Sequence, residues 1–361
     1  MTKRPFYINP NLFFLFEKGA FCLWNYGSHE QFEIEKDLIT LLMDISQNKT
    51  IDRDNPHLAD LLENDVVSTS PYDSKPWGWD QLSRIFHRGT QNVPELQEKR
   101  SKKEMIHDFI GFSEGYSQRK ETHDKQEELQ KESNSIKLSK VDSNIDTLSF
   151  VDTLKTRFTS RHFSGEVVSE KNLSTVLFYT FGEIHDKWEG IEDTVDLIGV
   201  RKSSPSAGGI HSIQAYVTVF NVEGIESGLY LYDPKDNSLG LIHTKVDFER
   251  LITLMADQFY MEGLAFGVFM VSDLECVWAK YLHSRAYREI FLDAGHLSQT
   301  FQLTATALSL NTWLSGYFRD DDLMSYLGIS GENKAPLLFV GAGLGERTPL
   351  HPDMLEGLKE S

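Results

Sequence analysis

Cysteine is scarce in this chain. The two cysteines, Cys22 and Cys276, lie far apart in the sequence and form no spacing typical of a metal site. This scarcity excludes a small disulfide scaffold and predicts a disulfide-free protein of the cytoplasm that holds no metal ion.

Long apolar runs and positive charge are lacking as well. No apolar run approaches the ~20 residues that a membrane-spanning helix needs, and the basic start at 1–4 is not followed by the apolar segment and cleavage site of a signal peptide. Lysine and arginine total 36 against 54 aspartates and glutamates, a net charge of -18 at pH 7. We therefore expect neither a membrane nor a nucleic-acid partner, while a local basic pocket for one phosphate stays compatible with this charge.

The 361 residues, 40% of them hydrophobic, suffice for two or three domains. Residues 1–75 predict a small unit in which two strands flank a turn at Lys18–Gly19 and short helices follow. Residues 76–147 predict a helical connector and a polar linker, because 118–128 contains no aromatic or aliphatic residue. Residues 148–361 then form the main domain.

The first unit resembles the winged-helix peptide-clamp domains of peptide-modifying enzymes. In such domains a leader peptide adds a strand to an exposed sheet edge. An alternative is a structural appendage packed on the main domain, and the two interpretations stay open at this point.

The most informative stretch is the Ser/Gly loop, residues 201–211, which reads Arg-Lys-Ser-Ser-Pro-Ser-Ala-Gly-Gly-Ile-His. It precedes an alternating apolar run at 215–220 that predicts a strand. Its small side chains let a ligand approach the backbone, and bare amides in such a loop can hydrogen-bond a flat heteroaromatic ring or an anion. By itself the pattern is more often that of an ordinary loop.

Upstream, Arg157, Thr159 and Arg161 alternate within one short stretch. Two guanidinium groups and a hydroxyl at this spacing can clamp a phosphate through charge-assisted hydrogen bonds. A solvated basic turn is the simpler alternative.

Downstream, a buried strand is predicted at 266–272, and the dipeptide Lys280–Tyr281 follows shortly after it. A long helix is predicted at 287–310. The last core strand, at 336–343, leads to the basic residue Arg347.

In this order the motifs resemble those of the SagB-type dehydrogenases, flavin oxidases of azole-modified peptide biosynthesis in the FMN-dependent nitroreductase superfamily. The resemblance covers about residues 148–350 and includes the segments Arg157–Phe163, Pro205–Gly208, Gly228–Pro234, Lys280–Tyr281 and Asp293–Gln299. It implies an α+β fold: a nitroreductase-like, FMN-binding antiparallel sheet flanked by helices, here preceded by the small winged-helix-like domain.

The resemblance also implies roles for individual residues. The cofactor-binding set is Arg157, Thr159, Arg161, Pro205, Ser206, Ala207, Gly208, Gln299 and Arg347. The catalytic pair is Lys280 and Tyr281, since a partly desolvated lysine can act as a base and a phenol can position it or relay the proton. One departure concerns the family's Gly-His-x-x-Gln-Asn, because Thr300 stands where the asparagine is expected.

The function implied is the oxidation of thiazolines or oxazolines in a ribosomally made peptide to thiazoles or oxazoles, with oxygen reoxidising the flavin. The implied partners are the azoline-containing precursor peptide, the cyclodehydratase that makes it, and a second copy of the chain in a homodimer whose flavin sites use both subunits. Two alternatives remain open. One is an FMN oxidoreductase acting on another peptide modification, a carrier-bound heterocycle or a small molecule, and the other is a non-catalytic docking subunit of a peptide-modifying synthase.

Overall fold

A computed structural model describes residues 6–72, 77–78, 80–91, 101, 103–105, 107, 135–141, 147–185, 201–348 and 350–360. The chain divides into two compact units. One contains Met1–Arg100 with His283–Arg285, and the other contains Ser101–Leu282 with Ala286–Ser361. The polar part of the predicted linker, 118–128, lies outside the described residues, as does most of 183–199, which the sequence predicts to be an acidic loop. Within the described ranges, no helix combines the length and the apolar character needed to cross a bilayer.

The first unit has small sheets and short helices. Its three-stranded antiparallel sheet, in the order β2-β3-β4, contains the predicted hairpin, whose turn residues Lys18 and Gly19 have φ angles of 49° and 84°. Leucines of the helices pack on this sheet around the fully buried Leu23. The elements are β1 (Tyr7–Ile8), β2 (Leu12–Glu17), β3 (Ala20–Asn25), β4 (Glu30–Glu33), α1 (Lys36–Ser46), α2 (Pro56–Glu63), β5 (Val67–Ser68) and α3 (Gln81–Gly89).

Strand β2 forms one edge of this sheet and carries exposed aromatic side chains. Phe14 is 47% and Phe16 is 82% exposed, and both rings pack against Phe21 of β3. The winged-helix-like, peptide-clamp character of this unit stays a prediction, as do the domain boundaries at residues 75 and 147.

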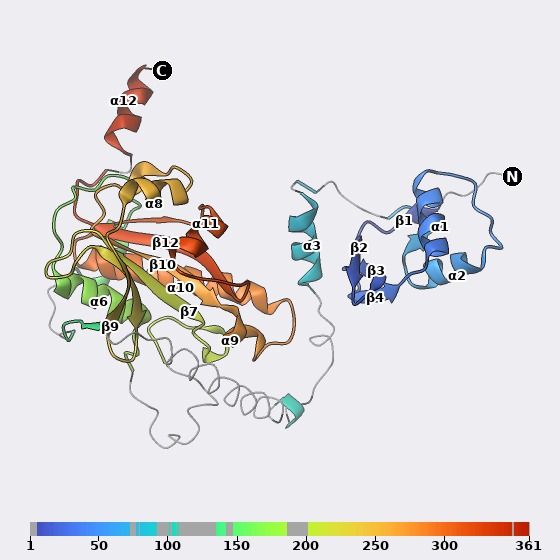
Figure 1. Cartoon of the computed structure of the whole chain (residues 1–361), viewed down its shortest axis with the longest axis horizontal. Helices are drawn as coiled ribbons and strands as arrows, with labels where there is room; N and C mark the ends of the chain where they lie inside the picture. Colours follow the sequence, from blue (N-terminus) through green and yellow to red (C-terminus); the bar gives the residue numbers. More distant parts are fainter. Residues whose placement is uncertain are drawn as a thin grey trace. The chain divides into compact units, whose positions relative to one another are not determined.

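The second unit is built on a seven-stranded sheet in the order β11-β12-β10-β7-β8-β9-β6 (Figure 1). Every neighbouring pair of strands is antiparallel. The antiparallel α+β fold expected from the sequence is therefore confirmed. The strands are β6 (Ser135–Lys137), β7 (Ile213–Val219), β8 (Gly228–Asp233), β9 (Ser238–Thr244), β10 (Phe266–Asp273), β11 (Asn311–Ser315) and β12 (Lys334–Gly343).

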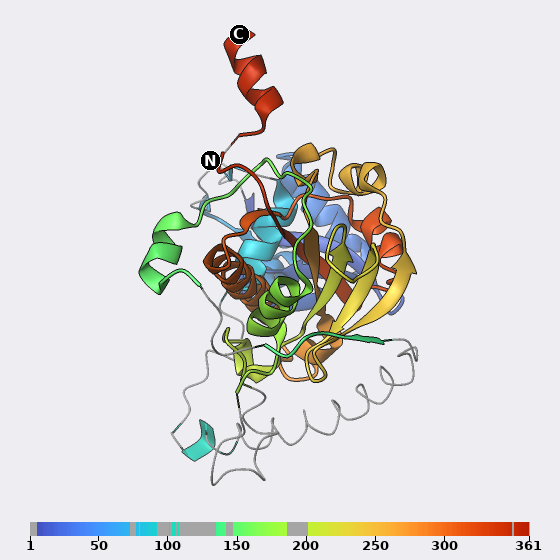
Figure 2. The ribbon, with the colours of Figure 1, turned by 90° about the vertical axis from the view of Figure 1, so that its left-hand side faces the viewer.

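Helices cover both faces of this sheet. Alternate residues of a strand point to opposite faces, so neighbouring residues of one strand belong to different cores. Val217 belongs to the core under α6 (Glu170–Phe181) and α10 (Ala286–Ala307), which lie side by side in Figure 2. Its neighbour Tyr216 belongs to the core under α8 (Phe248–Leu254) and α11 (Asp320–Tyr326). The remaining helices are α5 (Phe150–Thr156), which packs on α10, α9 (Leu274–Trp278), which follows β10 directly, and α12 (Pro352–Glu360).

Two local expectations were wrong. The sequence pattern predicts a helix over 248–261, but the helix ends at Leu254. The Leu254 carbonyl accepts from the distant Arg319 amide at 2.8 Å, and Ala256 and Asp257 have positive φ angles of 52° and 63°. The stretch 76–147, predicted as a helical connector and polar linker, contains β6, which forms because β9 supplies its pairing partner.

Candidate functional site

The Ser/Gly loop leads into β7 through a single 3-10 turn at Ala207–Gly209. Gly208, Gly209 and His211 all have positive φ angles, 59°, 66° and 51°. Glycine adopts this left-handed backbone without strain, whereas His211 adopts it at a cost. Strained backbone of this kind persists only where surrounding groups hold it, so the contacts of the loop are the first evidence of a site.

Lys280 holds the loop from one side. The buried strand β10 ends at Asp273, whose carboxylate caps α9, and Lys280 and Tyr281 follow that helix directly. The Lys280 side chain is 7% exposed, and its Nζ donates a hydrogen bond to the carbonyl of Gly208 at 2.7 Å. The structure therefore brings together Lys280 and Gly208, which the sequence predicts in two separate sets of site residues.

Tyr281 lies against the same glycine. A Cβ atom built on Gly208 would come within 2.6 Å of the Tyr281 hydroxyl oxygen. Burial raises the pKa of Tyr281, and the nearby carboxylates of Glu289 and Asp293 raise it further. The phenol therefore keeps its proton near neutral pH and can act as a hydrogen-bond donor.

Asp293 of α10 holds the loop from the other side. Its Oδ2 accepts a hydrogen bond from Ser206 Oγ at 2.5 Å, and its Oδ1 accepts one from the Ala207 amide at 3.3 Å. Asp293 was not among the site residues predicted from the sequence, although it begins the segment Asp293–Gln299. The available signal was a carboxylate on the apolar face of a helix, four residues before Leu297 and eight before Phe301.

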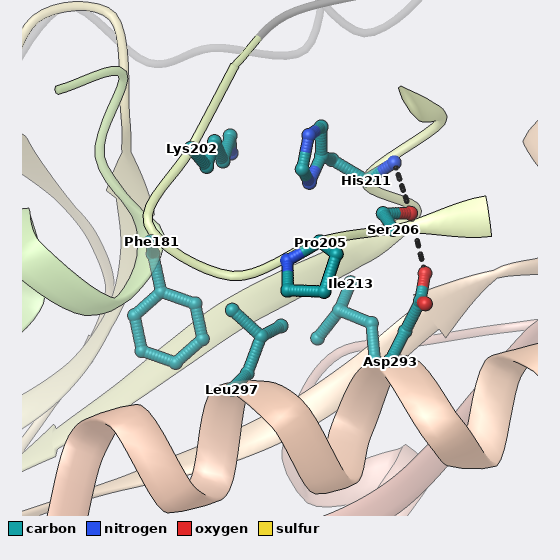
Figure 3. Close-up of a pocket in the computed structure, with 8 residues that line it drawn as sticks. All are labelled: Phe181, Lys202, Pro205, Ser206, His211, Ile213, Asp293 and Leu297. Carbon is teal, nitrogen blue, oxygen red and sulfur yellow. Dashed lines mark hydrogen bonds between the residues drawn. The ribbon is translucent and has the colours of Figure 1, made fainter. Parts of the chain in front are cut away.

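The Ser/Gly loop and Asp293 border a pocket that Figure 3 shows in close-up, and Lys280 and Tyr281 are not among its lining residues. Pro205 and Ser206, both predicted to bind the cofactor, line it, while the predicted Ala207 and Gly208 lie in the adjoining turn. Lys202 and His211 also line it, above the loop in the view, and Asp293 points up toward Ser206 from α10. The apolar lining comes from Phe181, Pro205, Ile213 and Leu297.

The predicted phosphate ligands form a second group, around residues 156–161. Arg157 donates to the buried Gln302 of α10 at 3.3 Å, and Thr159 bridges to Thr312 at the start of β11. The Arg347 guanidinium donates to the carbonyl of Thr156 and lies 4.9 Å from the Phe158 ring centroid. Arg347 and Arg157, 190 positions apart, therefore meet at one short segment.

The remaining members of the predicted set lie differently. The Arg161 guanidinium lies over the Tyr260 ring, 5.7 Å from its centroid. Gln299 is exposed on α10, is not among the residues lining the pocket, and is rotated about 240° around the helix from Asp293.

The donor chemistry of the second group suits a phosphate. Arginines provide fork-shaped donors that match phosphate oxygens, and two of them, Arg157 and Arg347, converge on residues 156–158. The Thr312 hydroxyl, beside Thr159, is buried and has no hydrogen-bond partner in the described part of the protein.

Helix α10 separates the two groups. Asp293, which binds the Ser/Gly loop, and Gln302, which binds Arg157, are nine residues apart on this helix. Nine residues correspond to 2.5 turns at 3.6 residues per turn. The loop group and the arginine group consequently lie on opposite sides of α10.

Comparison with known proteins supplies a family context. A family model described as the nitroreductase family matches residues 154–344, slightly more than half of the chain. A candidate nitroreductase of Methanocaldococcus jannaschii is 26% identical over 199 residues, which are 55% of this chain and 92% of that protein. The trifolitoxin operon protein TfxC of Rhizobium leguminosarum bv. trifolii is 28% identical over 119 residues, 32% of each chain.

Among solved structures, a candidate nitroreductase from Anabaena variabilis shares 28% sequence identity with this chain at a TM-score of 0.46. The similarity covers 55% of this chain and 38% of the Anabaena chain. The chain therefore spans about a third of the length of the Rhizobium and Anabaena relatives, and most of the length of the Methanocaldococcus one.

Proposed function

Since the chain belongs to the nitroreductase family, we propose that it is an oxidoreductase that dehydrogenates azoline rings of a ribosomally made peptide. Membership of this family indicates a flavin-dependent enzyme with FMN as its cofactor. The observation that carries the finer proposal is the contact of Lys280 and Tyr281 with Gly208, because it unites at one site the motifs that resemble those of the SagB-type dehydrogenases. The similarity to a relative named as a trifolitoxin operon protein is consistent with such a context.

The chemistry makes two demands on the site. Aromatising an azoline removes one hydrogen as a hydride and one as a proton; FMN, when bound, supplies the hydride acceptor. The proton needs a base held at a fixed place. A neutral Lys280 amine can donate one N–H to the Gly208 carbonyl and keep its lone pair for the proton, while the protonated Tyr281 hydroxyl places an O–H that can donate beside Gly208.

Residues of both groups would hold the cofactor. Arg157 and Arg347, with the hydroxyls of Thr159 and Thr312, would bind the phosphate. The backbone of Pro205, Ser206, Ala207 and Gly208 would lie along the flavin ring, and the absence of a side chain at Gly208 leaves room for Lys280 and Tyr281 beside the loop. Arg161 and Gln299 stay predicted ligands to which the structure gives no comparable geometry.

The position of the two groups on opposite sides of α10 supports a homodimer in which each FMN takes its phosphate ligands from one chain and its ring contacts from the other. Apolar side chains that a second copy would cover are exposed on α5 and on the first half of α10. They are Phe150 at 70%, Val151 at 56%, Leu154 at 49%, Phe291 at 48% and Leu292 at 55% exposure.

Substitution of Arg157 by alanine should weaken FMN binding by about 1.5–3 kcal/mol, the value of a charged hydrogen bond, or about 10–150-fold. Quenching of FMN fluorescence on titration measures this. Arg319→Ala, which removes a half-exposed arginine paired with Asp257 at 3.4 Å, is the matched control and should bind FMN normally.

Mixing variants tests the shared site. In a tagged mixed dimer of one Arg157→Ala chain and one Gly208→Ala chain, a site shared between chains leaves one FMN site intact and one doubly damaged. We expect one retained FMN for each mixed dimer, although each variant alone retains little. A mixed dimer that retains none would place both groups in a site within one chain.

The catalytic proposal has a direct test. Incubated with a thiazoline- or oxazoline-containing peptide and oxygen, the yellow protein should lower the peptide mass by about two units for each ring, the two hydrogens lost. A protein that holds FMN and leaves all azolines unchanged would favour an FMN oxidoreductase of another substrate. A protein that cannot be loaded with FMN would favour a docking subunit.

A further inference from the structure

In the described part of the protein, both oxygens of the Asp293 carboxylate accept hydrogen bonds from the Ser/Gly loop. One oxygen accepts from Ser206 Oγ and the other from the Ala207 amide, and Ser206 Oγ in turn accepts from the His211 amide at 3.0 Å. This chain of hydrogen bonds runs from α10 to both ends of the turn, as Figure 3 shows for Asp293, Ser206 and His211.

The turn has few bonds of its own. Within it, the Gly209 amide binds the Ser206 carbonyl at 3.0 Å and the Ile210 amide binds the Ala207 carbonyl at 3.3 Å. Gly208, Gly209 and His211, three of four successive residues, have left-handed backbone. External groups must therefore keep the loop in shape: Asp293 binds its donors, and Lys280 binds its Gly208 carbonyl from the other side.

The charge of the Asp293 carboxylate is disfavoured by burial. Burial raises the pKa of Asp293 above its ordinary value of 3.8, although the hydrogen bonds from Ser206 and Ala207 and the charge of His296 act to lower it, while Glu289 adds to the rise. At a pH between 3.8 and the raised pKa, Asp293 is protonated in the folded chain and ionised in the unfolded chain. Its contribution to stability therefore falls as the pH rises through that window. The ionised form of Asp293 therefore lowers the stability of the folded chain at neutral pH. The other titratable groups around it are Lys202, His211, Lys280 and Tyr281.

We propose that Asp293 is a positioning residue of the flavin site, a role that rests on the proposed function. Acting through Ser206 and Ala207, it holds the loop in the one backbone shape that presents the loop to the flavin ring and places the Gly208 carbonyl at Lys280. It touches neither substrate nor proton in the reaction. A costly buried charge is retained because it fixes this loop.

The first measurement uses the flavin-free protein. Asp293→Asn keeps the volume of the side chain but offers one carbonyl oxygen where two acceptors stood, so one of its two donors loses its partner. Hydrogen exchange at the Ala207 and His211 amides should become about tenfold faster in this variant, while exchange in β7 and β10 stays unchanged. The thermal midpoint at pH 8 should be equal to that of the wild type or higher.

The second measurement is the FMN dissociation constant. Asp293→Asn should raise it about tenfold, as should Ser206→Ala, and the double variant should be no worse than either single one, because both changes break the same connection. Glu289→Gln is the matched control: it removes a charge one turn earlier on α10, from a side chain that makes no hydrogen bond to the loop among those described, and should leave FMN binding unchanged.

The outcomes separate the two hypotheses. An unchanged dissociation constant, or one that rises together with a fall in thermal midpoint and faster exchange in β7 and β10, overturns the positioning role and makes Asp293 a residue of the general fold. Wild-type protein that binds FMN normally but oxidises no azoline overturns the proposed reaction and leaves the role of Asp293 standing. Wild-type protein that binds no FMN overturns both.

Discussion

Replacement of Gly208 by alanine is expected to abolish most flavin-dependent turnover while the protein stays folded. The backbone at Gly208 has a φ angle of +59°, which alanine adopts at a cost of about 1–2 kcal/mol. The added Cβ would lie 2.6 Å from the Tyr281 hydroxyl oxygen and 3.1 Å from Lys280 Nζ. Both side chains must therefore move, and a displacement of about 1 Å at a reacting group can cost about 100-fold in rate.

The chain offers a matched control for the backbone strain. Gly224 has a similar φ of +72°, but a Cβ built there meets no atom within 4 Å. Gly224→Ala should therefore lose a similar amount of stability and keep both FMN and turnover. Thermal unfolding, FMN absorbance and the rate of flavin reduction are to be measured for both variants. Equal losses in the two would show that backbone strain, and not the crowding of Lys280 and Tyr281, accounts for the Gly208 result.

Removal of the Lys280 amine should slow flavin reduction by an azoline substrate by about 10²–10⁴-fold, the usual effect of deleting a general base. Lys280→Ala should nevertheless keep the yellow colour, because the lysine binds the loop at one carbonyl while Asp293 still holds its other side. Tyr281→Phe keeps the ring and loses only the hydroxyl, so it should reduce the rate without releasing FMN.

The variant Lys280→Arg distinguishes a general-base role of Lys280 from a role that only supports the loop. Arginine donates hydrogen bonds but stays protonated, so it can reach for the Gly208 carbonyl and cannot accept the substrate proton. A base role predicts little rescue, whereas a support role predicts recovery of the rate. Rates are normalised to bound FMN, with Lys171→Ala, an exposed lysine of α6, as the control. Normal flavin reduction in Lys280→Ala would remove the lysine from the mechanism.

Features set by neighbouring residues could be predicted from the sequence. The hairpin turn at Lys18–Gly19 formed as expected, because glycine there takes a positive φ angle. Helix α6 begins after Ser169, whose side chain accepts a hydrogen bond from the Asn172 amide, and it ends before Gly182. Strand β10 could be recognised as buried because its apolar run is continuous, and every residue of it is buried. In each case the deciding interactions lie within a few residues of one another.

The family motifs could be recognised for the same reason, since each is a short run of residues: the arginines at 157 and 161, the Ser/Gly loop and Lys280–Tyr281. Their order along the chain was sufficient to indicate an FMN-dependent oxidoreductase, in agreement with the family match over residues 154–344. Their individual chemical roles stay predictions.

The arrangement of the site was decided only by the tertiary structure. Lys280 reaches the Gly208 carbonyl across 72 positions and Asp293 reaches Ser206 across 87, and no local pattern encodes contacts at such separations. The early end of α8 and the pairing of β6 likewise depend on donors and acceptors from distant segments. The sequence by itself determined the elements and the chemical groups. Packing of α9 and α10 against the sheet determined which groups meet, because hydrogen bonds form between whichever donors and acceptors the packed backbone brings within about 3 Å.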